Sequence, residues 1–333
     1  MKAFHIDRYG TDVAGRISDL PDPAARGNDV LVKVHAASVN VLDYKILRGD
    51  FKRILPYKFP LILGNDLAGV VVAVGPEVRR FKVGDNVYGY PGRDRIGTFA
   101  ELISVREDSL ALKPGNVDME QAASVPLVGL TAWQVLVDVA QIRKGQKVLI
   151  HAGSGGVGTF AIQLAKHLGA IVAATTSTGN IDLVKSLGAD IVIDYKTQHF
   201  ENELSDYDVV LHTLGRDILE KSLQVLKPGG HLISISGPPD PEFARQRNLP
   251  WLARQLVRLM SHGIRRQARK RDIRYAFVFV QPNGTQLETI STAIESGTVK
   301  PVIDRSFGFD AVADALRYIE KGRSRGKVTI KIQ

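Results

Sequence analysis

Three glycines with the spacing G-x-G-x-x-G are the strongest chemical signal in this sequence. Gly153, Gly155 and Gly158 follow directly on a short apolar run, residues 148–150. The residues after them carry apolar side chains at helical spacing up to a stop at Gly169. A strand, a glycine turn and a helix in this order bind the pyrophosphate of a dinucleotide, because the backbone can approach it closely and the helix start offers free N–H groups. The predicted contacts are Gly153, Ser154, Gly155, Gly156, Val157 and Gly158. A glycine-rich turn without a ligand is the alternative.

The tip of the second strand decides which dinucleotide fits. In NAD-binding proteins an Asp or Glu about 20 residues past the loop holds the ribose 2′-hydroxyl. Residues 175–180 here read TTSTGN and contain no carboxylate, and Lys185 and Lys196 follow soon after. Short hydroxyl donors suit a 2′-phosphate, so we predict NADPH as the cofactor. The predicted contacts are Thr176, Ser177 and Asn180. The alternative is that these residues only cap the next helix.

The chain contains no cysteine among its 333 residues. This excludes disulfides, thiolate catalysis and every zinc site that needs a thiolate ligand. The eight histidines show no metal-ligand spacing. We therefore predict that the protein works without a metal.

Composition and the N-terminus favour an ordinary globular protein of the cytoplasm. Hydrophobic residues make up 44% of the chain and charged residues 24%. The longest apolar runs, such as residues 69–75 and 171–174, fall far short of the about 20 residues that a membrane span requires. The first ten residues, MKAFHIDRYG, alternate like a strand and lack the apolar stretch of a secretory signal.

The order of predicted elements divides the chain into two parts. Up to about residue 115, short strand patterns are cut by Gly and Pro, which is typical of a β-rich domain or partly closed barrel. After residue 118, apolar strand patterns, the last at 276–280, alternate with helical ones, which predicts a parallel sheet covered by helices. The final segment KVTIKI, residues 327–332, alternates like a barrel strand. We therefore expect the C-terminal tail to return to the β-rich part.

Several motifs in a fixed order resemble one protein family over essentially the whole chain. They are ASVNVLDYKILRGD (37–50), PLILGNDLAGVVVAVG (60–75), KVGDNVYGY (82–90), GTFAE (97–101), VGLTAW (128–133), the glycine loop and LKPGGHLISISG (226–237). The chain is similar to the zinc-independent quinone and enone oxidoreductases of the medium-chain dehydrogenase/reductase superfamily. The resemblance implies an α/β fold, with a GroES-like catalytic domain at 1–122 and 275–333. A doubly wound Rossmann domain that binds NADPH would occupy residues 123–274.

The resemblance also indicates the reaction. Zinc-dependent members carry a catalytic Cys and a Gly-His-Glu motif, whereas this chain reads Gly64, Asn65, Asp66 at that place. Without a Lewis acid to polarise the reacting oxygen, alcohol dehydrogenation is disfavoured. Hydride addition to an activated C=C of an α,β-unsaturated carbonyl, or to a quinone, depends less on such polarisation. The alternatives are a 2-enoyl thioester reductase and a catalytically silent NADPH-binding sensor or interaction protein. Family membership further implies a small-molecule partner and a homodimer or a monomer.

The active-site segment of the family matches SVNVLDYK, residues 38–45. The resemblance therefore implies catalytic roles for Asn40, Asp43, Tyr44 and Lys45, with Lys45 as the first candidate for the donor to the developing enolate oxygen and Asn40 as the second. The alternative is structural: Asp43 and Lys45 would form a local ion pair, and Asn40 would cap the following helix.

The remaining cofactor contacts come from the resemblance and from the strand ends of a doubly wound sheet. Thr131 resembles a residue at the nicotinamide end, and Tyr195 one beside the adenosine phosphate; a helix cap and a structural tyrosine are the respective alternatives. The strand-end contacts are Leu214, Gly215, Phe279 and Val280.

Basic residues are concentrated in one segment. Residues 244–274 hold ten Arg or Lys against one acid, Asp272, and so account for the chain's net charge of +9. Within it WLARQLVRLM, residues 251–260, can form a helix with one apolar face. A solvated face or a dimer contact is the simplest interpretation. The alternatives are an anionic membrane, nucleic acid, or the edge of a cleft for a phosphate-bearing substrate such as an acyl-CoA.

Overall fold

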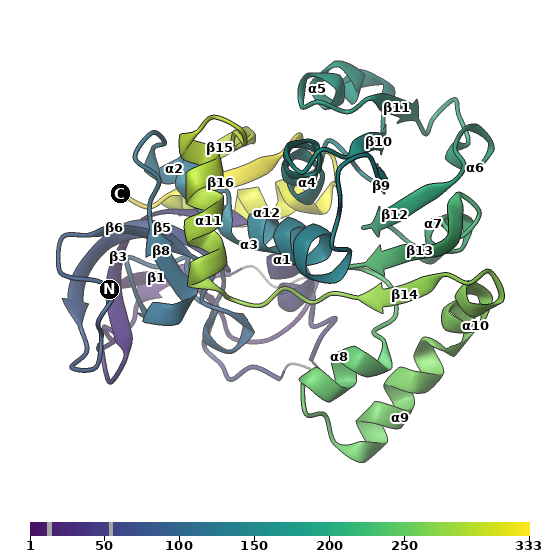
Figure 1. The fold of residues 1–333 in the computed structure, drawn as a ribbon. Helices are drawn as coiled ribbons and strands as arrows, with labels where there is room; N and C mark the ends of the chain where they lie inside the picture. Colours follow the sequence, from purple (N-terminus) through teal and green to yellow (C-terminus); the bar gives the residue numbers. More distant parts are fainter. Residues whose placement is uncertain (12–14, 53–55) are drawn as a thin grey trace. The chain divides into compact units, whose positions relative to one another are not determined.

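The computed structural model describes residues 1–11, 15–52 and 56–333. Its backbone forms two compact units. The colours of Figure 1 follow the sequence, so the residues of each unit can be located there. Unit 1 comprises Met1–Leu130 and Gln281–Gln333, and unit 2 comprises Thr131–Val280. From the sequence, the corresponding divisions were predicted after residues 122 and 274.

Unit 1 is built on two sheets. The smaller sheet has the order β2-β1-β4 and is antiparallel, with β1 Lys2–Ile6, β2 Arg16–Asp19 and β4 Leu61–Ile62. The larger sheet has the order β15-β16-β3-β5-β6-β8, and β7 pairs with β3 beside it. Its strands are β3 Asp29–Val39, β5 Asp66–Val74, β6 Asn86–Gly89, β7 Leu102–Arg106, β8 Leu110–Leu112, β15 Ile303–Gly308 and β16 Lys327–Lys331. Because β16 pairs antiparallel with β3, the prediction that KVTIKI joins the β-rich part is confirmed.

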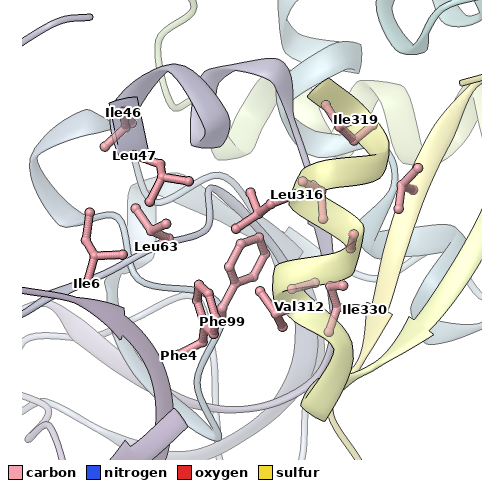
Figure 2. Packing of buried hydrophobic residues seen from close by; sticks show 14 of the residues in the cluster. Phe4, Ile6, Ile46, Leu47, Leu63, Phe99, Val312, Leu316, Ile319 and Ile330 are labelled. Carbon is pink, nitrogen blue, oxygen red and sulfur yellow. The ribbon is translucent and has the colours of Figure 1, made fainter. Parts of the chain in front are cut away.

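Helices from both ends of the chain close the core of unit 1. They are α1 Val41–Arg48, α2 Met119–Ala123, α11 Gly284–Glu295 and α12 Val312–Glu320, with the short turns η1 Arg93–Arg95, η2 Glu107–Ser109 and η5 Phe309–Ala311. Figure 2 shows Ile46 and Leu47 of α1 and Leu316 and Ile319 of α12 pointing into one cluster around Phe99. This shared core fixes α1, which carries the predicted catalytic residues Asp43, Tyr44 and Lys45 and is preceded by the fourth, Asn40.

Unit 2 is a six-stranded parallel sheet with the order β11-β10-β9-β12-β13-β14. The strands are β9 Lys147–Ile150, β10 Ile171–Thr176, β11 Ile191–Asp194, β12 Tyr207–His212, β13 Leu226–Ser234 and β14 Arg274–Phe277. This is the doubly wound order in which the chain reverses direction beside the first strand. The predicted fold class is therefore confirmed, although the sixth strand begins at Arg274 and ends at Phe277 instead of spanning residues 276–280.

The helices of unit 2 alternate with its strands up to β13 and then follow one another. They are α4 Gly156–His167, α5 Ile181–Ser186, α6 Phe200–Glu203, α7 Arg216–Lys221, α8 Pro241–Gln246, α9 Trp251–Met260 and α10 His262–Lys270, with the turn η4 Thr178–Asn180. Helix α3, Pro126–Trp133, continues into the π-helical segment η3, Gln134–Val139. In the part of the chain that is described, no helix combines the length and the apolar character that crossing a bilayer demands.

Candidate active site

The start of α4 is shaped to receive an anion. Its N-cap is Gly155, which has extended backbone geometry and no side chain that could accept from the helix. The N–H groups of the first helical turn have no intrahelical partner, and the helix dipole adds positive potential there. A glycine at this position therefore leaves Gly156, Val157 and Gly158 with donors directed toward whatever binds the loop.

Two glycines of the loop serve different needs. A side chain at Gly158 would lie 2.3 Å from the carbonyl oxygen of Ala152, so the tight turn itself excludes any larger residue. A side chain at Gly155 would meet only that same oxygen, at 3.4 Å, which is ordinary contact. Packing within the protein does not require Gly155. Its missing side chain instead leaves room for a close ligand, which is the fit expected for a pyrophosphate.

A cluster of hydroxyls and one amide lies beside this loop. Thr176 Oγ1 donates to Ser154 Oγ over 3.1 Å, and Asn180 Nδ2 donates to Ser154 Oγ and Ser177 Oγ over 3.0 and 3.1 Å. Ser154 and Ser177 thus accept hydrogen bonds while their own hydroxyl protons remain free for an acceptor. A phosphate accepts hydrogen bonds only, so the two hydroxyls match a 2′-phosphate.

The neighbouring strand, β11, ends at a carboxylate, Asp194, that already accepts hydrogen bonds within the protein. Asp194 accepts from Thr178 Oγ1 at 2.6 Å and from the Lys196 N–H at 3.0 Å. The Thr178 hydroxyl and then the Lys196 N–H lower the pKa of this carboxyl. Tyr195 is 61% exposed, and its N–H donates to Thr176 O over 3.1 Å, which brings Tyr195 beside the hydroxyl cluster.

The other predicted cofactor contacts are distributed over unit 2. Thr213 Oγ1 donates to the His151 carbonyl over 3.2 Å, so the loops after β9 and β12 touch, and Leu214 and Gly215 follow directly. A side chain at Gly215 would have open space around its Cβ, because no other group lies within 4 Å of that position. Phe279 and Val280 follow β14, which β12 and β13 separate from β9, and Thr131 is buried at 3% exposure.

In unit 1 a buried ion pair holds the start of α1. Asn40 Nδ2 donates to Asp66 Oδ2 over 2.8 Å, and Lys327 Nζ donates to Asn40 Oδ1 and Asp66 Oδ2 over 2.5 and 3.1 Å. Ser38 Oγ and the Leu127 N–H also donate to Asp66, over 2.8 and 2.7 Å. The Asn40 side chain is therefore fixed by the network. Asn40 is also the N-cap residue of α1, as the structural alternative expected, and its N–H donates to the Asp43 carboxylate over 2.7 Å.

Asp43 is a second buried carboxyl, with no exposed surface. It accepts from the Asn40 N–H over 2.7 Å and from Asn65 Nδ2 over 2.6 Å. Burial raises the pKa of Asp43 to about 7, against the opposing effect of these two hydrogen bonds. Because both oxygens are occupied inside the protein, the suggested ion pair between Asp43 and Lys45 does not form.

The two remaining candidates lie on the outer side of α1. The Tyr44 hydroxyl donates to Glu320 and accepts from Arg48 Nη1 over 3.1 Å, so its polar group is engaged away from the buried network. Lys45 is half-buried, and its ammonium has no hydrogen bond or ion pair with any residue that the structure describes. Of the four predicted catalytic residues, Lys45 therefore has a donor available to a ligand, while Asn40 and Asp43 position the helix.

Sequence reasoning did not identify Lys327 and Asp66 as part of this site. They are 261 residues apart, and their contact depends on the pairing of β16 and β5 with the two sides of β3. Asp66 appeared in the sequence analysis only as a position where zinc enzymes differ. Lys327 is the first residue of an alternating strand pattern, where an exposed lysine is also common. The local sequence therefore does not indicate that Lys327 is buried.

The residues that could bind metal are dispersed in the structure. Across residues 1–11, 15–52 and 56–333, no group of three or more His, Asp or Glu side chains could hold an ion. At the position of the zinc motif, Asn65 contacts Asp43 and Asp66 contacts Lys327. Internal hydrogen bonds therefore engage Asn65 Nδ2 and the Asp66 carboxylate.

Comparison with known proteins agrees with this geometry. Residues 26–115 match the family described as alcohol dehydrogenase GroES-like domain, and residues 187–330 match the family described as zinc-binding dehydrogenase. Together the matches define a dehydrogenase or reductase of the medium-chain class. The chain lacks the cysteines of its zinc-dependent members.

Individual relatives show which group of medium-chain enzymes the chain resembles. The chain is 38% identical to a 2-methylene-furan-3-one reductase of Solanum lycopersicum and 38% identical to an NADPH-dependent alkenal/one oxidoreductase, chloroplastic, of Arabidopsis thaliana; each match covers 99% of the chain and 79% of the relative. The solved quinone oxidoreductase of Coxiella burnetii has a TM-score of 0.85 and 31% identity, with 100% of this chain and 99% of that chain covered. The chain belongs to the zinc-independent quinone and enone oxidoreductase family.

Proposed function

We propose that this protein is an NADPH-dependent reductase that adds hydride to the activated C=C of an α,β-unsaturated carbonyl compound or to a quinone. The single observation that carries the choice of cofactor is the cluster of Ser154, Thr176, Ser177 and Asn180 beside the start of α4. It offers unpaired hydroxyl donors where NAD-binding proteins have a carboxylate. The relatives named above, which act on an alkenal or enone, support the substrate class.

The residues of unit 2 would hold the cofactor. The N–H groups of Gly156 and Val157 at the start of α4 would bind its pyrophosphate, and the hydroxyls of Ser154 and Ser177 would bind its 2′-phosphate. We further propose that Thr131, Tyr195, Leu214, Gly215, Phe279 and Val280 contribute to the same cofactor site. NADPH, when bound, supplies the hydride.

Lys45 would supply the donor that this chemistry needs. Hydride addition to the β-carbon leaves negative charge on the carbonyl oxygen, and a preorganised ammonium stabilises that charge as it develops. Lys45 Nζ has no internal partner among the described residues and is therefore free to donate there. Asn40 and Asp43 act indirectly, because their hydrogen bonds to Asp66, Lys327 and Asn65 fix the start of α1.

Steady-state oxidation of NADPH with a panel of acceptors tests this function. We expect turnover with a small enone or a quinone, slower turnover with a crotonyl thioester, and a lower kcat/KM with NADH. Turnover of the thioester alone would favour a 2-enoyl thioester reductase. NADPH binding without turnover of any acceptor would favour a silent binding protein.

The place in the cell where the enzyme acts is a separate proposal. One relative is named as chloroplastic. We propose the cytoplasm for this chain. Cell fractionation followed by an assay of NADPH-dependent enone reduction would test this.

A further inference from the structure

Helix α9 exposes an unusual amount of apolar surface. Fifteen large apolar side chains are exposed in the described residues, and five of them lie on this ten-residue helix. They are Trp251 at 68%, Leu252 at 74%, Leu256 at 59%, Leu259 at 72% and Met260 at 52%. Scattered exposed apolar residues are normal, but a contiguous group marks an interaction site.

The spacing of these residues gives α9 two faces. Leu252, Leu256 and Leu259 follow the i, i+4, i+7 pattern and share one side of the helix. Ala253 is half-buried and Val257 is buried, and this pair, also four residues apart, forms the side that packs on the protein. The leucine stripe is therefore not part of the packing that holds α9 in place.

Helices α9 and α10 also carry positive charge that no ion pair neutralises within the described residues. Arg254 and Arg258 lie on α9, and Arg265, Arg266, Arg269 and Lys270 lie on α10; none of the six forms an ion pair with a described acid. Arg254 Nε donates to the Leu249 carbonyl over 2.6 Å, and Arg269 Nε to the Arg265 carbonyl over 3.3 Å, so both keep their full charge. Partial burial and then the nearby Arg269 lower the pKa of Arg265, as expected where like charges are crowded.

Charge complementarity indicates which kind of partner binds the exposed surface of α9 and α10. A second copy docked symmetrically through α9 would bring the same arginines face to face, which is unfavourable. Nucleic acid would neutralise the arginines but would leave the leucines in water. An anionic bilayer surface accepts both, because arginines contact its phosphates while Leu and Trp side chains enter the boundary below the headgroups. Figure 1 shows α8, α9 and α10 following one another within unit 2.

We infer that α9 and α10 form a docking surface for an anionic lipid bilayer, with α9 lying in the plane of the interface. The stripe Leu252, Leu256 and Leu259 would enter the headgroup region, and the arginines would hold the phosphates. The inference is independent of the proposed reductase function.

Vesicle flotation with the full chain tests the inference. We expect binding to phosphatidylcholine vesicles that contain about 30% phosphatidylglycerol, at least about tenfold weaker binding to pure phosphatidylcholine, and release at about 0.5 M NaCl. In a Trp133→Phe background, Trp251 is the only tryptophan, and its fluorescence should shift to shorter wavelength on binding.

Two triple variants separate the apolar and the charged contributions. Leu252→Ser with Leu256→Ser and Leu259→Ser should abolish binding, and Arg258→Gln with Arg266→Gln and Lys270→Gln should weaken it by about a hundredfold. The matched controls change exposed residues elsewhere and should bind like the original chain. They are Val83→Ser with Leu112→Ser, and Lys33→Gln with Lys321→Gln and Arg323→Gln. Unchanged circular dichroism and enone reduction would show that each variant is folded.

Three results would overturn the inference. The first is no binding to anionic vesicles. The second is vesicle binding that the leucine variant leaves unchanged. The third is the absence of vesicle binding together with another interaction. That interaction would be either a dimer that the leucine variant dissociates or RNA binding that the leucine variant leaves intact.

Discussion

At the residue scale, the described residues of the two candidate sites include two kinds of donor that have no internal acceptor. Ser154 and Ser177 accept from their neighbours and keep their own protons free, and Lys45 keeps its ammonium free. Asn40 and Asp43 have no such surplus, since their polar atoms contact Asp66, Lys327 and Asn65. The surplus donors define where negative charge of a ligand can be bound.

The first prediction concerns the hydroxyl cluster. Ser177→Asp places a carboxylate beside the position proposed for the 2′-phosphate, which like charge repels, whereas a ribose 2′-hydroxyl can donate to it. The ratio of kcat/KM for NADPH to that for NADH should fall by at least about tenfold. Ser186→Asp, an exposed serine on α5, is the control and should leave the ratio unchanged. An unchanged ratio in Ser177→Asp would remove this residue from the cofactor site.

The second prediction concerns Lys45. Lys45→Met removes the ammonium that stabilises the enolate oxygen, and kcat should fall by about a hundredfold while KM for NADPH stays within about twofold. Lys33→Met, an exposed lysine on β3, should behave like the original enzyme. A variant at position 45 with full kcat would show that the donor lies elsewhere.

Local patterns predict some of these residues and miss others. The glycine loop and the hydroxyls after β10 follow from spacing alone, because strand, loop and helix are consecutive in the chain. Asn40 was expected either as a donor or as a helix cap, yet its side chain is held by Lys327, 287 residues away. Such a contact depends on strand pairing that no local pattern contains.

At the scale of elements, α1 is positioned by strands from both ends of unit 1. β16 pairs with β3, and Lys327 at its start reaches Asp66 at the start of β5. The pair is buried, with side-chain exposures of 5% and 0%. Removing one partner of such a pair leaves an uncompensated charge in the interior.

The third prediction follows from this pair. Lys327→Met should lower the free energy of unfolding by about 3–5 kcal/mol, because Asp66 stays buried without its cation. Lys331→Met on the same strand is the control, and since Lys331 is exposed its effect should stay within about 0.5 kcal/mol. Urea unfolding compares the three proteins. An equal decrease in the free energy of unfolding in both variants would mean that the buried ion pair contributes no more than an exposed lysine.

The order of elements was easier to predict than their limits. Repeated strand and helix patterns after residue 118 correctly indicated a parallel sheet, since each unit is local. The sixth strand nevertheless begins at Arg274, whose charged side chain hides the start of the pattern, and it ends at Phe277. Edge strands such as β14 are the least constrained by burial, so their sequence specifies their limits weakly.

At the scale of the whole molecule, buried histidines couple stability to pH. Burial lowers the pKa of His151 to about 3 and that of His212 to about 4, so both stay neutral in the native state while the unfolded chain protonates them below about 6.5. Their contribution to stability is complete above pH 6.5 and is lost as the pH falls. Asp43, with its raised pKa, acts in the opposite direction between about pH 4 and pH 7.

The fourth prediction uses this linkage. Between pH 6.5 and 5.0 the free energy of unfolding should fall, and His212→Asn should reduce that fall by about 1.6 kcal/mol over the whole interval. His262→Asn, at an exposed position on α10, should keep the original dependence. Urea midpoints at the two pH values measure it. A dependence that is identical in His212→Asn would contradict a neutral native imidazole at this position.

We propose that unit 2 binds NADPH and recognises its 2′-phosphate through the hydroxyls beside α4. Calorimetric titration of the full chain with NADPH and with NADH tests it most directly. We expect NADPH to bind at least about tenfold more tightly than NADH, because only NADPH carries the phosphate that Ser154 and Ser177 can bind. Equal affinity for the two cofactors, or no binding of either, would contradict it.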